Sequence, residues 1–225
     1  METSDVFTLK LLIDDQVSNY FPGQFITVYF PELGTPEGKA YSISSSPSEN
    51  TINITVKSMG SFSRKLCSLE IGDNIMASLP YGYFYSESEN THLVMIAGGI
   101  GVAPFRSMIV NSIKLNQKRK LTLFYSNRSV DDIIFRKEFN EISLIHENFK
   151  VIYFITRQKI FDPCFVLGRM SVIDIIGNEK MGRKKISGKE FLICGSISFV
   201  RDFWKGLRDS GVSEEVLYTE AFFSH

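Results

Sequence analysis

The stretch that decides the fold is His92-Leu-Val-Met-Ile-Ala-Gly-Gly-Ile-Gly-Val-Ala-Pro-Phe-Arg106. Its apolar run 93–97 predicts a strand that is buried on both faces, as strands of a parallel sheet are. The glycines that follow predict a tight turn, and Pro104 suits the first turn of a helix, because that turn needs no amide donor. A strand, a glycine turn and a helix N-terminus together present backbone N–H groups to a phosphate. The stretch therefore predicts a dinucleotide site, although Pro104 replaces the third glycine of the usual G-x-G-x-x-G motif and a plain strand–helix corner would use the same residues.

Length and charge limit the possible classes of protein. The 225 residues suit one large domain or two compact ones, and 44% hydrophobic with 22% charged residues are globular values. The 25 basic and 25 acidic side chains give a formal net charge of zero, which disfavours nucleic acid or an anionic membrane surface as the main partner. No apolar run approaches the ~20 residues of a membrane helix, and the acidic start does not resemble a signal peptide.

The three cysteines, Cys67, Cys164 and Cys194, are odd in number and far apart. They match neither a disulfide framework nor the closely spaced thiolates of an iron–sulfur or zinc site. The three histidines are scattered as well, so we expect no metal. We expect a reducing cytoplasmic setting, in which any redox chemistry comes from an organic cofactor.

The chain divides into two halves of different pattern. Residues 1–88 contain short strand candidates such as 25–30 and 51–56, separated by turn residues, which predicts a small antiparallel β-barrel. Residues 89–225 alternate apolar runs with helical candidates, which predicts an α/β domain with a doubly wound parallel sheet and a ligand at the carboxyl ends of its strands. The expected linker is 86–90. Strands are expected at 93–97, 121–125, 151–155 and 191–194, and helices at 103–115, 132–145, 171–177 and 197–210.

Seven motifs follow one another along the chain: Pro22-Gly-Gln-Phe25, Lys39-Ala-Tyr-Ser42, Gly60-Ser-Phe-Ser63, Pro80-Tyr-Gly82 with Phe84, Gly98-Gly-Ile-Gly-Val-Ala-Pro104, Cys194-Gly195 and Glu220-Ala-Phe222. In these motifs and their order the chain resembles the ferredoxin–NADP reductase-like flavoproteins. Any one motif is weak, but the ordered set spans nearly the whole chain. The resemblance implies an FAD-binding domain at 1–88 and an NAD(P)-binding domain at 89–225.

On the flavin side, the resemblance implies that Tyr41 stacks on the isoalloxazine and that Ser42 hydrogen-bonds near N5, where hydride arrives. A plain strand end is the alternative. Lys39 replaces the family's arginine, which keeps the charge near the diphosphate but loses the bidentate fork. The turn 60–63 and a helix at 63–69 would bind phosphate, although the same residues suit an ordinary helix cap. The cofactor-binding residues expected on this side are Lys39, Tyr41, Ser42, Ile43, Val56, Gly60, Ser61, Phe62, Ser63 and Phe222.

On the nucleotide side, the resemblance implies a phosphate turn in which Ile100 replaces a common threonine but leaves the backbone amides. Arg128 follows the second strand with no acidic residue at 126–128, which favours a 2′-phosphate and hence NADPH over NADH. A solvated loop arginine is the alternative. The residues expected to bind the nucleotide are Gly98, Gly99, Ile100, Gly101, Pro104, Arg128 and Gly195.

The catalytic residues implied by the resemblance are Ser42, Cys194 and Glu220. Cys194 would help to place the nicotinamide and need not be a nucleophile, because hydride transfer needs only a donor carbon roughly 3–3.5 Å from the flavin. A small buried hydrophobe is its alternative role. Glu220 would polarise the ring edge or supply a proton, and Phe222 or Phe223 would cover the flavin. The alternative for this tail is a last strand at 216–219. Ser196 and Phe199 depart from the family's proline and methionine.

The sequence therefore predicts an FAD-dependent oxidoreductase that takes hydride from NAD(P)H and passes electrons to a separate acceptor, a protein carrier, an oxygenase component or a small molecule. The rival hypothesis is an NAD(P)H:flavin reductase that uses free flavin as a substrate, with which Lys39 is compatible. A third hypothesis is a non-catalytic flavin-binding subunit. Relatives of that sort have a cysteine-rich segment near the C-terminus, and no cysteine follows Cys194.

Overall fold

A computed structural model describes residues 1–12, 19–178 and 188–222. By its contacts the chain divides into two units. The first unit contains 1–85 and 103–114, and the second contains 86–102 and the described residues from 115 onward. The chain therefore leaves the first unit, returns to it for one helix, and leaves it again. The boundary expected between 88 and 89 stays a prediction, and it differs from this division in where it places residues 103–114.

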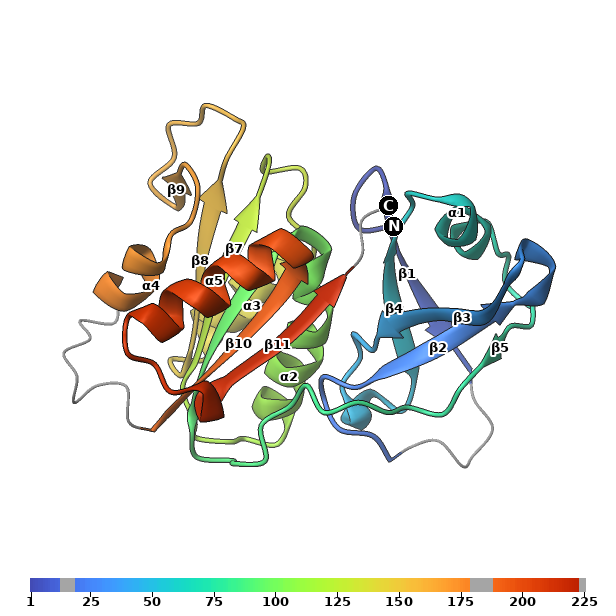
Figure 1. Ribbon diagram of the computed structural model, residues 1–225, viewed down its shortest axis with the longest axis horizontal. Helices are drawn as coiled ribbons and strands as arrows, with labels where there is room; N and C mark the ends of the chain where they lie inside the picture. The colour runs from blue at the N-terminus through green and yellow to red at the C-terminus, as the bar shows by residue number, and fades with distance from the viewer. Residues whose placement is uncertain (13–18, 179–187, 223–225) are drawn as a thin grey trace. The chain divides into compact units, whose positions relative to one another are not determined.

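The first unit contains two small antiparallel sheets (Figure 1). One pairs β1 with β4, and the other has the order β3-β2-β5. A single bridge between Ile43 and Ile54 joins β4 to the residue that follows β3. The elements of this unit are β1 (Val6–Leu11), β2 (Phe25–Phe30), η1 (Pro31–Leu33), β3 (Thr35–Ser42), η2 (Pro47–Glu49), β4 (Ile52–Lys57), α1 (Ser61–Cys67), β5 (Met76–Ala77) and α2 (Ala103–Lys114).

The core of this unit forms because β2 and β4 are rich in β-branched residues that fit a half-buried sheet. Ile26, Val28 and Ile54 are at most 2% exposed. Helix α1 closes the core with Phe62 and Leu66, which lie one turn apart on its buried face. The predicted antiparallel β architecture of the N-terminal half is confirmed, as two short sheets with one bridge between them among the described residues.

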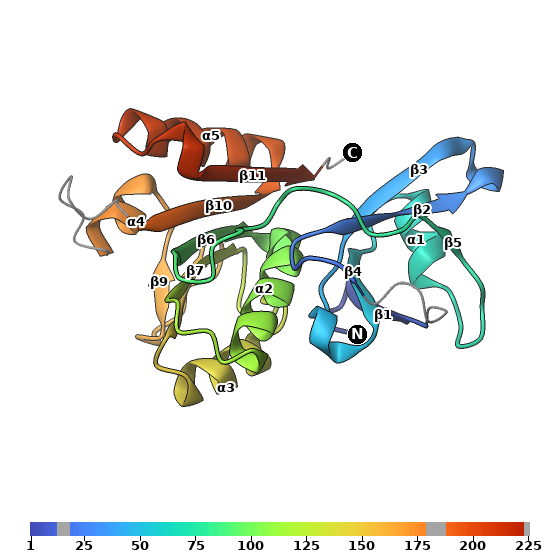
Figure 2. The ribbon, with the colours of Figure 1, turned by 90° about the horizontal axis from the view of Figure 1, so that it is seen from below.

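The second unit is built on a six-stranded parallel sheet with the order β11-β10-β6-β7-β8-β9. Helices α4 and α5 cover one face, and α3 lies on the other (Figure 2). This confirms the predicted doubly wound α/β architecture. The elements are β6 (His92–Gly98), η3 (Gly99–Val102), β7 (Leu121–Asn127), α3 (Arg136–Ile145), β8 (Phe149–Ile155), β9 (Phe165–Leu167), α4 (Val172–Asn178), β10 (Lys189–Ser196), α5 (Ile197–Asp209), η5 (Glu214–Val216) and β11 (Leu217–Phe222).

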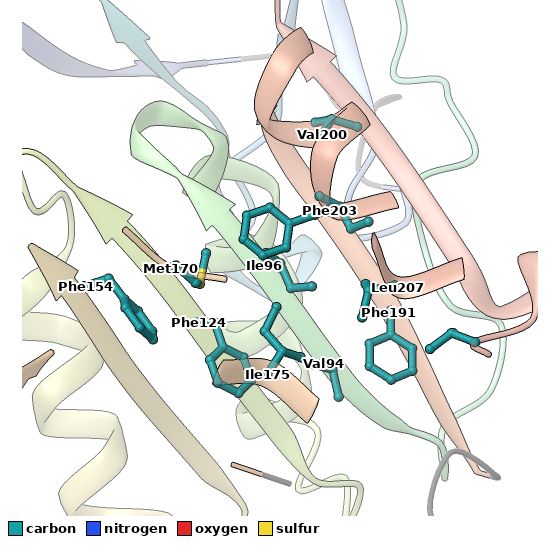
Figure 3. Packing of buried hydrophobic residues seen from close by; sticks show 12 residues of the cluster. Val94, Ile96, Phe124, Phe154, Met170, Ile175, Phe191, Val200, Phe203 and Leu207 are labelled. Atoms are coloured by element: carbon teal, nitrogen blue, oxygen red, sulfur yellow. The ribbon is translucent and has the colours of Figure 1, made fainter. Parts of the chain in front are cut away.

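Alternate residues of the central strands form the core between the sheet and α4 with α5 (Figure 3). Val94 and Ile96 of β6 point to this face, as do Phe124 of β7 and Phe191 of β10. Phe203 of α5 packs onto them. The central strand β6 is buried on both faces, as its continuous apolar run predicts.

Three elements differ from the sequence expectation. The helix expected at 132–145 begins only at Arg136, because Phe135 has a left-handed backbone with φ of 59° and cannot lie within a helix. The helix expected at 63–69 runs from Ser61 to Cys67. Strand β11 extends the expected 216–219 through Glu220 to Phe222, and Phe223 lies outside the described residues. Among the described residues, no helix is both long and apolar enough to cross a membrane.

Candidate functional site

The end of β3 places an aromatic side chain beside a buried hydroxyl. Tyr41 is half-buried, and its ring lies 6.4 Å from that of Phe62, with 26° between their planes. Burial, together with the nearby Cys67 thiol, raises the pKa of Tyr41 to about 12, so its hydroxyl stays protonated at neutral pH. Ser42 is 4% exposed and pairs with Phe25 of β2. The end of β3 thus offers a half-buried ring at Tyr41 and a buried hydroxyl at Ser42.

Lys39 lies on the same strand and reaches α1. Its ammonium group is 5.7 Å from the centre of the Phe62 ring. Lys39 is exposed, and the turn of 60–63 begins the helix that Phe62 belongs to. The structure therefore brings one cation to the turn that the sequence indicates as a phosphate site.

Ser63 uses its hydroxyl inside the turn itself. The oxygen accepts hydrogen bonds from the N–H groups of Met59 at 2.9 Å and Gly60 at 3.0 Å, and the hydroxyl donates to the Gly60 carbonyl. This differs from the N-cap by Ser61 or Ser63 that the sequence offered as an alternative, because the N-cap of α1 is Gly60 and Ser63 bonds back to it from the third position of the helix. The first amides of α1 have no carbonyl within the helix to bond. No atom lies within 4 Å of the point where a Cβ on Gly60 would stand, so the backbone there is open to a ligand.

Three of the expected cofactor-binding residues have side chains that lie in the core of the first unit. Ile43 and Val56 are at most 1% exposed and belong to the hydrophobic cluster of the first unit. Phe62 is 2% exposed in the same cluster. Since these side chains are already covered by protein atoms, only their backbone groups are available to a cofactor.

The three glycines of the nucleotide turn differ in what surrounds them. Gly99 has a left-handed φ of 53°, and no atom lies within 4 Å of the point where its Cβ would stand, so it makes the turn and leaves its backbone open. A Cβ on Gly101 would stand 2.3 Å from the Cys194 carbonyl oxygen, so this glycine permits close packing on β10. A Cβ on Gly98 would stand 3.2 Å from the Phe199 ring. Gly99 is therefore the glycine of this turn whose backbone is open, with Ile100 beside it.

The Phe199 ring lies against the ends of two neighbouring strands, β6 and β10. A Cβ on Gly195 would lie 2.9 Å from its ring, and Gly98 lies beside Gly195 in the sheet. Ser196 caps the N-terminus of α5 by accepting a hydrogen bond from the N–H of Phe199 at 3.4 Å. The residues that depart from the family pattern thus have packing and capping functions here. Pro104 is buried in the first turn of α2, as expected of a proline there.

Cys194 and Glu220 lie side by side at the carboxyl ends of β10 and β11, where the register pairs them. The thiol is buried and lies 4.0 Å from Oε2 of Glu220, which can accept its hydrogen. Burial, and after it the Glu220 charge, raises the pKa of Cys194 well above its ordinary value. The thiol is therefore neutral at physiological pH and is not prepared to act as a nucleophile. Phe222 pairs with Ser196 at the end of the same strands.

Arg128 follows β7, and a second arginine that the sequence pattern did not indicate lies beside it. The N–H of Arg157, just after β8, donates to the Arg128 carbonyl at 2.8 Å, and both residues are exposed. The pairing of β7 with β8 brings them together, although 29 positions separate them along the chain. Asp132, a nearby carboxylate, accepts from the N–H and hydroxyl of Ser129. The strand ends thus present two exposed cations.

Asn127 ends β7 directly before Arg128 and is 5% exposed. Its amide lies near the Tyr125 hydroxyl, but neither amide atom makes a hydrogen bond of ordinary geometry with the described residues. A buried amide without protein partners is costly, and in native proteins such a group is usually explained by an ordered water, an ion or a functional role. The signal in the sequence was only a polar residue after an apolar run.

Family models match both parts of the chain. Residues 2–85 match the oxidoreductase FAD-binding domain, and residues 95–205 match the oxidoreductase NAD-binding domain. Among curated proteins, the chain is similar to a flavohemoprotein of Rhizobium meliloti, with 27% identity over 96% of this chain and 56% of the relative. It is equally similar, at 27%, to the sulfhydrogenase 2 subunit gamma of Pyrococcus furiosus, over 95% of this chain and 76% of that subunit.

Solved structures share the fold. The Amycolatopsis cytochrome P450 reductase GcoB superposes with a TM-score of 0.85 and 21% identity, over 99% of this chain and 66% of that one. A ferredoxin NADP+ reductase from Neisseria gonorrhoeae, with bound FAD and NADP, gives 0.78 and 20% identity over 99% and 94%. The chain spans little more than half of the flavohemoprotein. Since its two domain models together match most of its length in the order of the motifs, the chain belongs to the ferredoxin–NADP reductase-like flavoprotein family and contains both an oxidoreductase FAD-binding and an oxidoreductase NAD-binding domain.

Proposed function

We propose that this reductase takes its hydride from NADPH, transfers it to FAD, and delivers electrons to a separate acceptor. The observation that supports NADPH is the pair Arg128 and Arg157, exposed and joined through their backbones at 2.8 Å. Two guanidinium groups suit a phosphate monoester, because each can donate charge-assisted hydrogen bonds to its oxygens. A free ribose 2′-hydroxyl is instead recognised by a carboxylate.

The residues of the first unit fit a flavin. Tyr41 offers a half-buried ring for stacking, Ser42 a hydroxyl at the strand end, and Lys39 a cation near the open turn at Gly60. When bound, FAD supplies the acceptor for a hydride and the means to pass electrons on. The chain contributes the stacking surface, the hydroxyl that addresses one edge of the ring, and the charge that meets the diphosphate.

The residues of the second unit fit the nicotinamide nucleotide. Gly99 presents an open backbone to the diphosphate, with Ile100 next to it, and the arginine pair binds the far phosphate. Cys194 keeps its proton and, with Glu220, forms a pair of polar groups that orients the reacting end without forming a bond to it. Their task is positioning, because hydride transfer depends on holding donor and acceptor atoms in line.

The acceptor is proposed from the chemistry of this chain. Its three cysteines are free and include one that is exposed and one that is buried, and no group of metal-binding side chains occurs among the described residues. The relatives by name act in different settings, as a flavohemoprotein, a sulfhydrogenase subunit and a cytochrome P450 reductase. We propose a protein carrier or an oxygenase component as the acceptor.

A second candidate function is an NAD(P)H:flavin reductase that binds and releases free flavin. Lys39 favours it, because a lysine without the bidentate fork holds a diphosphate less firmly than arginine does, and its ammonium lies over the Phe62 ring in place of an ion pair with an acidic side chain. A loosely held FAD would behave as a substrate.

The visible absorption spectrum of the purified protein, recorded before and after anaerobic addition of NADPH and separately of NADH, tests the proposal. We expect a flavin band that bleaches faster with NADPH. Bleaching only after free flavin is added would support the flavin reductase. Equal rates with NADH would contradict the proposed donor, and a flavin that stays oxidised with both donors would contradict catalysis and leave a non-catalytic flavin-binding subunit.

A further inference from the structure

Helix α2 is attached to the first unit by a set of polar contacts that none of the cofactor motifs explains. We call this set the clamp: Arg106, Ser107 and Asn111 on α2, and the segment 44–49 that follows β3. Both parts belong to the first unit. The clamp is unusual in being polar and buried, since Ser44, Ser45 and Ser46 are all 0% exposed.

Arg106 makes the central contacts. Its Nη1 donates to the Ser44 carbonyl at 2.8 Å and to Oε2 of Glu49 at 3.1 Å, and its Nη2 donates to Oε1 of Glu49 at 3.3 Å. The side chains of Arg106 and Glu49 are 13% and 20% exposed. A bidentate pair fixes direction as well as distance, and a mostly buried pair is little screened by salt.

Glu49 is itself fixed by the segment it belongs to. Its Oε2 accepts the Ser46 N–H at 2.6 Å, which completes a capping box around η2. Burial alone would raise the pKa of Glu49, but hydrogen bonds from Arg106 and the Ser46 N–H, with the charges of Arg106 and Lys114, lower it overall. Glu49 is therefore an ionised, immobile partner for the guanidinium.

Two further hydrogen bonds hold α2 along its length. The Ser107 hydroxyl donates to the Ser45 carbonyl at 2.5 Å, and the Ser46 hydroxyl donates to Oδ1 of Asn111 at 3.1 Å. Contacts over positions 106, 107 and 111 span more than one helical turn. Such a set resists both sliding and rotation of the helix.

Along the chain, one end of the clamp is close to the expected flavin-binding residues, and the other follows the expected nucleotide-binding turn. Ser44 comes two residues after Ser42, and α2 begins at Ala103, directly after η3 with its open Gly99. A helix transmits restraint along its axis, because its backbone is hydrogen-bonded throughout. What holds the first two turns of α2 therefore also limits the freedom of the glycine turn that leads into them.

We propose that Arg106, through Glu49, is a positioning residue for hydride transfer: the clamp restrains the glycine turn at the start of α2, which holds the diphosphate of the bound nucleotide and, through the diphosphate, limits the movement of its reacting end. The proposal rests on the proposed function for its kinetic consequence but not for the restraint itself. Arginine is required, because a lysine keeps the charge but cannot reach two Glu49 oxygens and a carbonyl in one plane.

The test compares Arg106→Met, Arg106→Lys and Glu49→Gln with Lys137→Met, a control that removes an exposed ion pair on α3. Stopped-flow reduction at low temperature gives the limiting rate, and titration with NADP+ and FAD gives the affinities. A misplacement of about 1 Å costs about 100-fold in rate. We expect Arg106→Met to slow the limiting rate by about 10- to 100-fold and Arg106→Lys by about 3- to 10-fold. FAD affinity should stay within about 3-fold, since the variants leave Tyr41 and Lys39 in place.

A purely structural role would lower the melting temperature and leave the limiting rate unchanged well below it. Limiting rates of Arg106→Met and Arg106→Lys within about 2-fold of the parent protein would overturn the proposal. The double variant Arg106→Met/Glu49→Gln should be no slower than the worse single variant, because the two side chains act as one unit. Fully additive losses would contradict coupling through Glu49.

Hydrogen exchange of the cofactor-free protein supplies a readout independent of activity. We expect faster exchange at 99–105 and 44–49 in Arg106→Met than in Lys137→Met. If the parent protein reduces no flavin, the proposed function fails. Hydrogen exchange alone then tests whether the clamp restrains residues 99–105. Unchanged exchange at 99–105 would overturn the restraint whatever the kinetics show.

Discussion

Replacement of Gly101 by alanine tests the close contact between the nucleotide turn and β10. A Cβ there would stand 2.3 Å from the Cys194 carbonyl oxygen, 2.5 Å from its carbon and 2.7 Å from the Gly195 nitrogen. All three are backbone atoms of a strand hydrogen-bonded on both sides, to β6 and β11, so they cannot move aside as a flexible side chain would. The turn must therefore shift by roughly 1 Å or the sheet must open.

We expect Gly101→Ala to lower the free energy of unfolding by about 3 kcal/mol, at the upper end of the usual cost of overpacking. For a chain of this size that corresponds to a melting temperature lower by roughly 6–12 °C. The affinity for NADP+ should fall as well, because the shift displaces the amides of η3. Thermal unfolding and a nucleotide titration on the same samples measure both effects.

Two other glycines are matched controls. Gly99→Ala meets open space but has a left-handed φ of 53°, so its cost should be about 1 kcal/mol of backbone strain. Gly60→Ala meets open space with an ordinary backbone, so its unfolding free energy should stay within about 0.5 kcal/mol of the parent. If Gly101→Ala is as stable as Gly60→Ala, the assigned packing of η3 on β10 is wrong.

Three further outcomes are expected. The double variant Arg128→Ala/Arg157→Ala should weaken NADPH binding by about 10- to 100-fold and NADH binding by less than about 3-fold. Isothermal titration measures both affinities. Equal losses for the two nucleotides would refute the assignment of this arginine pair to the 2′-phosphate. Because the folded-state pKa of Glu49 lies below its ordinary 4.5, its carboxylate stabilises the fold above that pH and the contribution disappears as the pH falls through the lowered value. The difference in urea midpoint between the parent protein and Glu49→Gln should thus shrink from pH 7 to pH 3, and a constant difference would contradict it. With limiting iodoacetamide at pH 7, mass spectrometry should find the exposed Cys164 alkylated before the buried Cys194. The pKa of both thiols is raised, so access decides the order, and the reverse order would exclude an inaccessible Cys194.

The architecture was predictable where the sequence pattern is long and continuous. The run at 93–97 could only be a fully buried strand, and it became β6 in the middle of the sheet. Strand β9 was not predictable, because it has three residues at the sheet edge, and its Val166 and Leu167 are 42% and 53% exposed. The late start of α3 depends on the left-handed backbone of Phe135. This could not be predicted from the sequence, because phenylalanine rarely adopts a positive φ.

The motifs in the sequence indicated the segments of the candidate site, but not how the residues of those segments are placed relative to one another. Arg128 stood out because it follows a buried strand, whereas Arg157 looked like any loop arginine until parallel pairing brought the two strand ends together. The buried amide of Asn127 could not be recognised either, because a missing hydrogen bond is a property of three-dimensional surroundings.

The stretch 92–106 explains why so specific a sequence is needed at one strand–helix corner. It performs three tasks in order, and each imposes its own residue type. Strand β6 is buried on both faces and therefore requires apolar side chains. The turn requires glycine at two positions for different reasons. Gly99 has an open, left-handed backbone, and Gly101 packs so closely on β10 that no Cβ would fit. The helix that follows belongs to the first unit, where Arg106 bonds Glu49 and the carbonyl of the buried Ser44. The stretch that indicates a phosphate site thus also contains the arginine that attaches its own helix to the segment 44–49, through contacts that a lysine could not reproduce.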